Sequence, residues 1–216
     1  MIDIVREIEA MRRTTGDRTT PSGNGKAVVL ERAYDAPIEE VWDALTNPER
    51  ISRWFLPISG DYRVGGRYQL EGNAGGEIVA CDRPSRFKVT WVYGEPENPA
   101  DVSEVEVRLS PVAGDRTRLE LAHVADVPMD RWAEYGPGAV GVGWDGALLG
   151  LGLHLRGGSI EDPNAWQVSD EGREFYTRSS EAWGEANRAA GAAPEEVARA
   201  VANTTAFYAP EPETVS

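Results

Sequence analysis

Two histidines and one cysteine are the side chains of this sequence best suited to acid–base, metal or thiol chemistry, and they lie far apart in it. His123, His154 and Cys81 form neither an H-x-x-x-H nor a C-x-x-C spacing, the patterns that bring two metal ligands together locally. There is also no G-x-S-x-G turn of the kind that exposes a serine nucleophile. We therefore predict no metal, no cofactor and no catalytic residue. A site assembled in space from His123 and carboxylates is the open alternative.

The stretch GVGWDG (141–146) matches the G-x-G-x-x-G pattern of dinucleotide-binding loops, with Glu161 downstream as a candidate ribose contact. In that motif a buried strand ends immediately before the first glycine. Here the preceding residues are RWAEYGPGA, which do not form a strand pattern. The sequence therefore argues against a nucleotide site.

Two polar residues occupy positions that strand alternation directs inward. His123 lies on the apolar face of TRLELAHV (117–124), and Arg32 lies on that of AVVLERAY (27–34). We favour a buried histidine hydrogen-bonded to backbone over a polar group in a pocket that binds a ligand or transfers a proton. A buried guanidinium needs an anionic partner. For Arg32 we favour a carboxylate of the chain over an acidic group of a ligand.

The composition is that of a folded, acidic protein. The chain has 216 residues, of which 41% are hydrophobic, and a formal net charge of −14. Its apolar fraction is sufficient for a sizeable core. The negative charge argues against nucleic-acid binding, which needs cationic side chains opposite phosphates, and against anionic membrane surfaces.

The sequence predicts a cytoplasmic location. A single cysteine excludes an intrachain disulfide and fits a reducing compartment. The first residues, MIDIVREIEAMRR, hold no cleavable apolar stretch. The longest apolar tract (138–155) is rich in glycine and contains Asp145 and His154. It is better suited to a buried helix than to a membrane span.

The elements that must position these residues follow from periodicity. Helical spacing predicts an amphipathic helix over residues 2–13, followed by a polar linker, TTGDRTTPSGNGK (14–26), and a first strand at 27–34. The segment 35–57 predicts two short helices in succession, with Pro48 restarting the helix.

Downstream, apolar and polar residues alternate in five segments separated by turn residues, which predicts a meandering antiparallel sheet. In RFKVTWVY (86–93), Trp91 and Tyr93 share the apolar face with two further residues. One face of the sheet should therefore be apolar and must be covered.

The helix predicted at 138–155 is the available cover. It contains five glycines, each of which costs a helix about 1 kcal/mol relative to alanine. Either close backbone approach or space left for something else would explain them. Two further helices are predicted in the tail, 157–216.

Aromatic side chains facing a helix poor in side chains can leave an apolar cavity. We predict such a cavity between the sheet and the long helix. The aromatic residues expected around it are Trp54, Phe55, Tyr68, Trp91, Tyr93 and Trp144.

Several phrases together resemble the SRPBCC (START/birch-pollen-allergen-like) superfamily, and within it the AHSA-like branch, named after a domain of an activator of the heat-shock-chaperone ATPase. They are VVLERAYDAPIEEVWDALTNPERISRWFLP (28–57), DYRVGGRYQLEG (61–72), RFKVTWVY (86–93) and the helix at 138–155. The resemblance implies an α+β helix-grip fold, a curved antiparallel sheet wrapped around a long C-terminal helix. The resemblance covers the helix-grip domain (27–156). An N-terminal helix and linker (1–26) precede it, and a helical C-terminal extension (157–216) follows it.

Members of the superfamily often enclose an apolar cavity between sheet and helix, and some bind lipids, hormones or polyketides. By position, the resemblance places Tyr68, Trp91, Tyr93, His123, Trp144 and Leu148 on the cavity wall, with Trp54 near its mouth.

Three functions follow as hypotheses. The favoured one is non-catalytic binding of a small hydrophobic or amphipathic molecule. The second is a polyketide-cyclase or dehydratase-like enzyme that uses His123 with a tyrosine such as Tyr93 as acid and base. The third is a co-chaperone or stress-related interaction module that uses the acidic surface and the helical tail. Alternatively, the tail would mediate homodimerisation or cover the outer face of the sheet.

Overall fold

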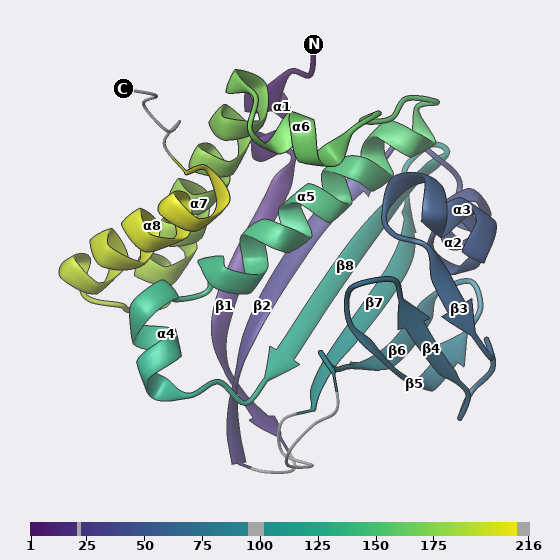
Figure 1. Cartoon of the computed structure of the whole chain (residues 1–216). Coiled ribbons are helices and arrows are strands. Elements are labelled where there is room, and N and C mark those ends of the chain that lie inside the picture. Colours follow the sequence, from purple (N-terminus) through teal and green to yellow (C-terminus); the bar gives the residue numbers. More distant parts are fainter. Residues whose placement is uncertain (21–22, 95–101, 211–216) are drawn as a thin grey trace.

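The protein is built on one curved antiparallel sheet of eight strands, in the order β1-β2-β8-β7-β6-β5-β4-β3. The computed structural model describes residues 1–20, 23–94 and 102–210. The strands are β1 (Met11–Thr20), β2 (Gly23–Tyr34), β3 (Ile58–Gly60), β4 (Arg67–Leu70), β5 (Gly75–Asp82), β6 (Arg86–Trp91), β7 (Ser103–Val112) and β8 (Arg116–Ala125). Figure 1 shows the sheet bending around a long central helix, which confirms the predicted helix-grip fold.

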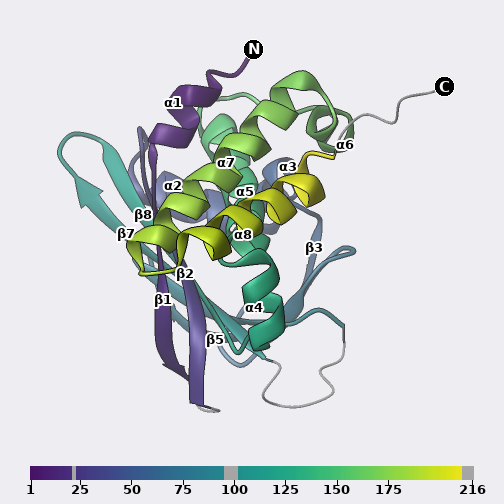
Figure 2. The same cartoon turned by 90° about the vertical axis from the view of Figure 1, so that its left-hand side faces the viewer.

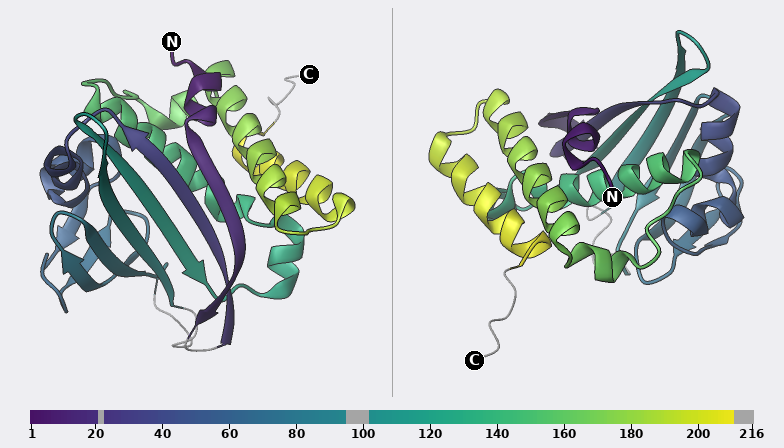
Figure 3. Two further views of the ribbon diagram at one scale, coloured as in Figure 1. Left: turned by 180° about the vertical axis from the view of Figure 1, so that it is seen from behind. Right: turned by 90° about the horizontal axis from the view of Figure 1, so that it is seen from above.

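The helices lie on the concave side of the sheet. They are α1 (Ile4–Glu9), α2 (Ile38–Thr46), α3 (Pro48–Trp54), α4 (Met129–Tyr135), α5 (Gly138–Leu155), α6 (Pro163–Gln167), α7 (Asp170–Ala189) and α8 (Pro194–Tyr208). Seen from behind, the convex face of the sheet is turned to the viewer, α5 lies beyond the sheet, and α7 and α8 lie beside the edge strand β1 (Figure 3). Within the described segments, no helix has both the length and the apolar character needed to cross a membrane.

The two short helices α2 and α3 form as predicted. Asn47 ends α2 in an extended conformation, and its side chain accepts a hydrogen bond from the backbone N–H of Glu49 at 3.0 Å. Pro48 occupies the first turn of α3, where its missing N–H costs nothing. The two helices close one end of the sheet (Figure 1).

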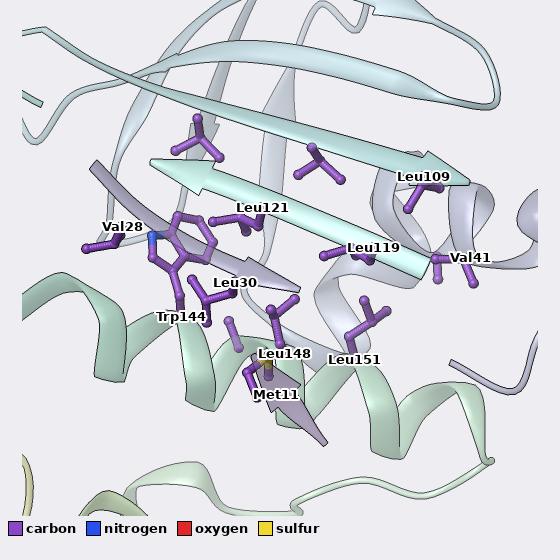
Figure 4. Close-up of a cluster of buried hydrophobic side chains, with 14 of the residues drawn as sticks. Met11, Val28, Leu30, Val41, Leu109, Leu119, Leu121, Trp144, Leu148 and Leu151 are labelled. Carbon is purple, nitrogen blue, oxygen red and sulfur yellow. The ribbon is translucent and has the colours of Figure 1, made fainter. Parts of the chain in front are cut away.

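The helix α5 has the bounds that the sequence predicts and covers the concave face. Trp144, Leu148 and Leu151 project from it toward Leu119 and Leu121 of β8 (Figure 4). All five side chains are buried. Burying such apolar surface is the main favourable contribution to folding, so this layer is the core of the protein.

The prediction for the N-terminal segment is wrong in part. The helix ends at Glu9, and the expected linker (14–26) instead belongs to two paired strands, β1 and β2, in register from Met11↔Arg32 to Thr20↔Gly23. Threonine is frequent in β1 and favours strands, and the polar composition fits an edge strand.

The tail (157–216) forms three described helices rather than two. Figure 2 shows α7 and α8 side by side, packed against the flank of α5. Phe175 and Trp183 of α7 are buried, and α7 also contacts the edge strand β1. The tail therefore packs on α5 and does not cover the outer face of the sheet.

Candidate functional site

An apolar cavity of about 390 Å³ lies between the sheet, α5 and the short helices α2 and α3. Strands β4 to β8 supply one wall, and α5 supplies Trp144, Ala147 and Leu148. The side chains of Trp144 and Leu148 can be followed in Figure 4. This volume lies within the range of small-molecule sites, which are concave and largely apolar.

Five aromatic rings form a continuous wall of the cavity. Trp91 and Trp144 have ring centroids 4.9 Å apart, and Tyr68 lies 6.4 Å from Trp91. Phe55 lies 6.4 Å from Trp144 and stacks on Trp54 at 5.5 Å. Offset and tilted arrangements of this kind are favourable for aromatic pairs. They also present flat ring surfaces to any occupant.

Three of the polar donors of this wall, those of Trp54, Tyr68 and Trp144, are hydrogen-bonded within the protein. Trp54 Nε1 donates to the carbonyl of Ala44 at 3.0 Å, and the Tyr68 hydroxyl donates to the carbonyl of Thr90 at 2.7 Å. Burial raises the pKa of Tyr68 above its usual value. Trp54 and Tyr68 therefore offer an occupant their ring faces rather than free donors.

The titratable groups of the lining lie mostly at the mouth. The lining of the cavity, taken over the described residues, contains no His, Asp, Glu or Lys. Arg63 is exposed and pairs with Asp61 at 2.7 Å, and Cys81 is exposed as well. The described lining therefore offers neither a histidine nor a carboxylate as an acid or base.

Five of the seven predicted site residues lie together in this cavity: Trp54, Tyr68, Trp91, Trp144 and Leu148. Tyr93 does not line it and is 68% exposed. The alternation of RFKVTWVY directed Tyr93 inward, but β6 ends at Trp91, so the alternation stops there. The prediction for Tyr93 is wrong.

His123 is buried but lies outside this cavity. Its Nδ1 accepts from Trp144 Nε1 at 3.0 Å. Its Nε2 is 2.9 Å from the hydroxyl of Ser103, which itself donates to the carbonyl of Trp91 at 2.6 Å. The imidazole is therefore neutral with its proton on Nε2, and both nitrogens are satisfied by side chains rather than by backbone.

Burial lowers the pKa of His123 from 6.5 to about 4. In the unfolded chain this histidine takes up a proton first, so it should destabilise the fold as the pH falls from 6.5 toward 4. The difference between the unfolded and folded pKa values of His123 corresponds to roughly 3 kcal/mol in the free energy of unfolding. We expect His123→Gln to lose less stability than the wild type over this range in urea unfolding at each pH. Parallel curves for the two proteins would contradict the assignment.

The favoured expectation for Arg32 is confirmed. Its guanidinium is buried and forms an ion pair with Glu7 of α1, which is also bound by Arg156 at 2.7 Å. The Arg32 side chain also lies over the ring of Tyr34, at 5.1 Å from the centroid. The partner is thus a carboxylate of the chain, and it ties α1 to the sheet.

The glycines of α5 serve close packing of the helices. A Cβ on Gly141 would lie 2.1 Å from Trp183 Cε2, and one on Gly138 would lie 2.8 Å from the Thr204 hydroxyl. A Cβ on Gly150 would lie 2.7 Å from the carbonyl of the last residue of α3. No glycine is among the described residues that line the cavity. Close approach therefore explains Gly141 and Gly150, whereas space for a ligand in this cavity explains none of the five glycines.

Comparisons with known proteins agree with this geometry. The family model of the Activator of Hsp90 ATPase homolog 1-like proteins (AHSA1) matches residues 35–155. The chain belongs to this family. The predicted resemblance to an AHSA-like SRPBCC domain is confirmed.

Solved structures with the AHSA1-like fold extend the comparison. The crystal structure of CalU16 from Micromonospora echinospora is 38% identical, with a TM-score of 0.66, and the match covers 85% of this chain and 99% of that one. MLL2253 from Mesorhizobium loti is 26% identical, with a TM-score of 0.52. The match covers 62% of this chain and 99% of that one. DynU16, at 22% identity and a TM-score of 0.50, shares the fold. The match covers 60% of this chain and 47% of that one. A search of curated proteins found no match.

The cavity belongs wholly to the AHSA1-like segment, because its lining residues lie between Leu45 and Leu148. Several of them are aliphatic residues that the sequence analysis did not single out, among them Ile51, Ile78 and Ala147. Strand alternation and helical spacing predict that these residues face inward. The same patterns apply to core residues, so they do not distinguish a residue that lines a cavity.

A second buried charge joins the AHSA1-like segment to the N-terminal strand and the tail. Asp145 of α5 is fully buried and accepts from Arg13 Nε of β1 at 2.8 Å. The same oxygen accepts from the Ser179 hydroxyl at 2.5 Å and from Trp183 Nε1 at 3.1 Å, both in α7. Asp145 therefore positions α5, which in turn supplies one wall of the cavity.

Proposed function

We propose that the chain binds a small, apolar, ring-containing molecule in the cavity between sheet and α5, without chemical change to it. The observation that carries this proposal is the wall of five aromatic rings around about 390 Å³ of space. Filling such a space with apolar surface is favourable, at about 25 cal/mol per Å² removed from water.

The polarity of the lining defines the class of ligand. The donors of Trp54, Tyr68 and Trp144 are already hydrogen-bonded to the protein. A ligand polar group that lies against Trp54, Tyr68 or Trp144 would lose its water without gaining a partner, which costs several kcal/mol. The best ligand is thus a flat or alicyclic hydrocarbon-like molecule whose polar groups remain at the mouth, near Tyr62 and Arg63.

The cyclase or dehydratase alternative is less well supported. It requires His123 and a tyrosine such as Tyr93 to face one substrate. His123 is paired on both nitrogens and its pKa is about 4, whereas Tyr93 is largely exposed. The interaction-module alternative and homodimerisation stay predictions.

A fluorescent apolar probe tests the proposal. N-phenyl-1-naphthylamine is uncharged, and its fluorescence increases in apolar surroundings. We expect saturable binding to the full chain, and Ala147→Phe should weaken it at least tenfold because the new ring occupies the cavity. Tenfold corresponds to about 1.4 kcal/mol.

Ala189→Phe is the matched control, because Ala189 is exposed near the end of α7 and lines no described cavity. It should bind the probe as the wild type does. Thermal unfolding of both variants shows that each is folded. Unchanged probe affinity in Ala147→Phe, with the fold intact, would rule out this cavity as the binding site.

A further inference from the structure

A second cavity, of about 300 Å³, lies at the opposite end of α5 and shares no lining residue with the first. It is enclosed by the paired ends of β2 and β8, by α4, by the first turn of α5 and by α8 (Figure 1). Its lining includes Val28, His123, Trp132, Val140, Thr204 and Phe207. Most of these side chains are apolar.

The C-terminal helix α8 closes this cavity. Its Tyr208 hydroxyl donates to the carbonyl of Ala139 at 2.8 Å, and its Thr204 hydroxyl donates to the carbonyl of Tyr135 at 3.2 Å. Both bonds hold α8 against the walls formed by α4 and α5. Because α8 lies outside the AHSA1-like segment, one wall of this cavity is formed by the C-terminal extension.

A wall of side chains separates the two cavities. His123 lines the second cavity, and its Nδ1 is bound by the indole N–H of Trp144, which lines the first. Trp91 packs against both rings, at 6.3 Å from His123 and 4.9 Å from Trp144. A substitution in the lining of one cavity therefore leaves every lining residue of the other cavity unchanged.

The mouth of the second cavity is apolar and open to solvent. Phe207 is 68% exposed and Val140 is 38% exposed, although both belong to the lining. Large apolar side chains are exposed in this way where a surface binds something. Their position favours an occupant with an apolar body.

The charges at this cavity have one sign. Lys26 and Arg131 are cationic, and the described lining includes no carboxylate, although the chain as a whole carries a net charge of −14. Lys26 lies over the Trp132 ring, at 5.1 Å, and also binds Asp17. Arg131 is 68% exposed, and its ion pair with Glu134 is long, at 3.8 Å, so turning its guanidinium toward a ligand costs little.

We propose that this second cavity binds a small amphipathic anion, a molecule with an aromatic or acyl body and one acidic group. The body would lie against Val28, Val140 and Phe207, and the acidic group would face Arg131 and Lys26. This inference is independent of the function proposed for the first cavity, whose apolar lining excludes a buried anion.

The test uses two probes with one ring skeleton. 8-Anilinonaphthalene-1-sulfonate carries a sulfonate, whereas N-phenyl-1-naphthylamine is its uncharged counterpart. We expect Ala139→Trp, which fills the second cavity from an exposed position of α5, to weaken binding of the sulfonate at least tenfold. It should leave binding of the uncharged probe unchanged. Ala189→Trp is the control and should change neither.

The charge is tested separately. The double variant Lys26→Met/Arg131→Met should weaken binding of the sulfonate by about three- to tenfold, the effect of one or two partly exposed ion pairs. The uncharged probe should again be unaffected. Ala147→Phe should show the reverse pattern, with the sulfonate bound as in the wild type.

The outcomes separate the two proposals. If the wild-type chain fails to bind the uncharged probe but binds the sulfonate in a way that Ala139→Trp weakens, the first proposal is overturned and this one stands. Sulfonate affinity that is insensitive to Ala139→Trp, or that falls in Ala147→Phe instead, would overturn this one. A mass of two chains in solution that falls to one in Ala139→Trp would assign this face to self-association and would also overturn it.

Discussion

Replacing Arg13 with methionine should lower the free energy of unfolding by about 3–5 kcal/mol, the effect of removing one partner from a buried ion pair. The Arg13 side chain is 6% exposed and that of Asp145 is 0% exposed. Without the guanidinium, the carboxylate keeps its bonds from Ser179 and Trp183 but has no opposite charge. Arg13 also donates to the carbonyls of Ile8 and Met11. Urea unfolding at neutral pH measures the loss.

A double-mutant cycle isolates the pair. Asp145→Asn alone should also be strongly destabilising, whereas Arg13→Met/Asp145→Asn should cost less than the sum of the two single variants. Arg188→Met, which removes an exposed ion pair with Glu185, should change stability by no more than about 0.5 kcal/mol. Additive single effects would contradict a direct coupling between Arg13 and Asp145.

The pH dependence of the Arg13→Met variant gives a second readout. Burial raises the pKa of Asp145, and the charge of Arg13 opposes this rise. In the variant the pKa of Asp145 should be higher still. A carboxyl whose pKa is raised in the folded state favours folding at low pH and opposes it as the pH rises. The stability deficit of Arg13→Met relative to the wild type should therefore shrink as the pH is lowered.

Gly141→Ala should be destabilising by roughly 2–4 kcal/mol, although alanine is the better helix former by about 1 kcal/mol. The new Cβ would lie 2.1 Å from Cε2 of Trp183. That indole is 1% exposed, and its N–H is bonded to Asp145 at 3.1 Å. The ring cannot move aside without breaking this bond, so α5 and α7 must separate. Thermal or urea unfolding measures the loss.

Gly143→Ala is the matched control on the same helix. Its Cβ would meet only the Tyr208 hydroxyl, at 3.2 Å, and Gly143 is exposed. We expect this variant to be as stable as the wild type or about 1 kcal/mol more stable. Equal changes in stability for the two substitutions would show that the contact with Trp183 does not determine the effect of alanine at position 141.

The elements with strong local signals could be predicted from the sequence. The apolar spacing of 138–155 and the turn residues on both sides of it define α5 to the residue. Asn47 and Pro48 mark the boundary between α2 and α3. In both places the pattern, the cap and the tertiary environment favour the same structure.

The strand β1 could not be predicted from its own composition and periodicity, because its stability comes from pairing with β2. Residues 14–20 are polar and include a glycine, which in isolation favours a loop. They form a strand because β2 supplies backbone hydrogen bonds along ten paired positions. The run of threonines was the available signal.

Alternation predicted which residues face inward but not what they face. His123 points inward as expected, yet the sheet near its end lies opposite α4 and α8, so His123 belongs to the second cavity. Tyr93 lies beyond the end of β6 and is exposed. The role of Asp145 was also missed, although a single acidic residue within an apolar helix signals a buried ion pair.

A crystal of the protein pressurised with xenon tests the central claim most directly, since xenon enters dry apolar cavities and is readily located. We expect at least one xenon atom in the first cavity, in contact with the rings of Trp91 and Trp144 and with Leu148. Side chains of the protein filling that space, with no xenon bound there, would contradict the account.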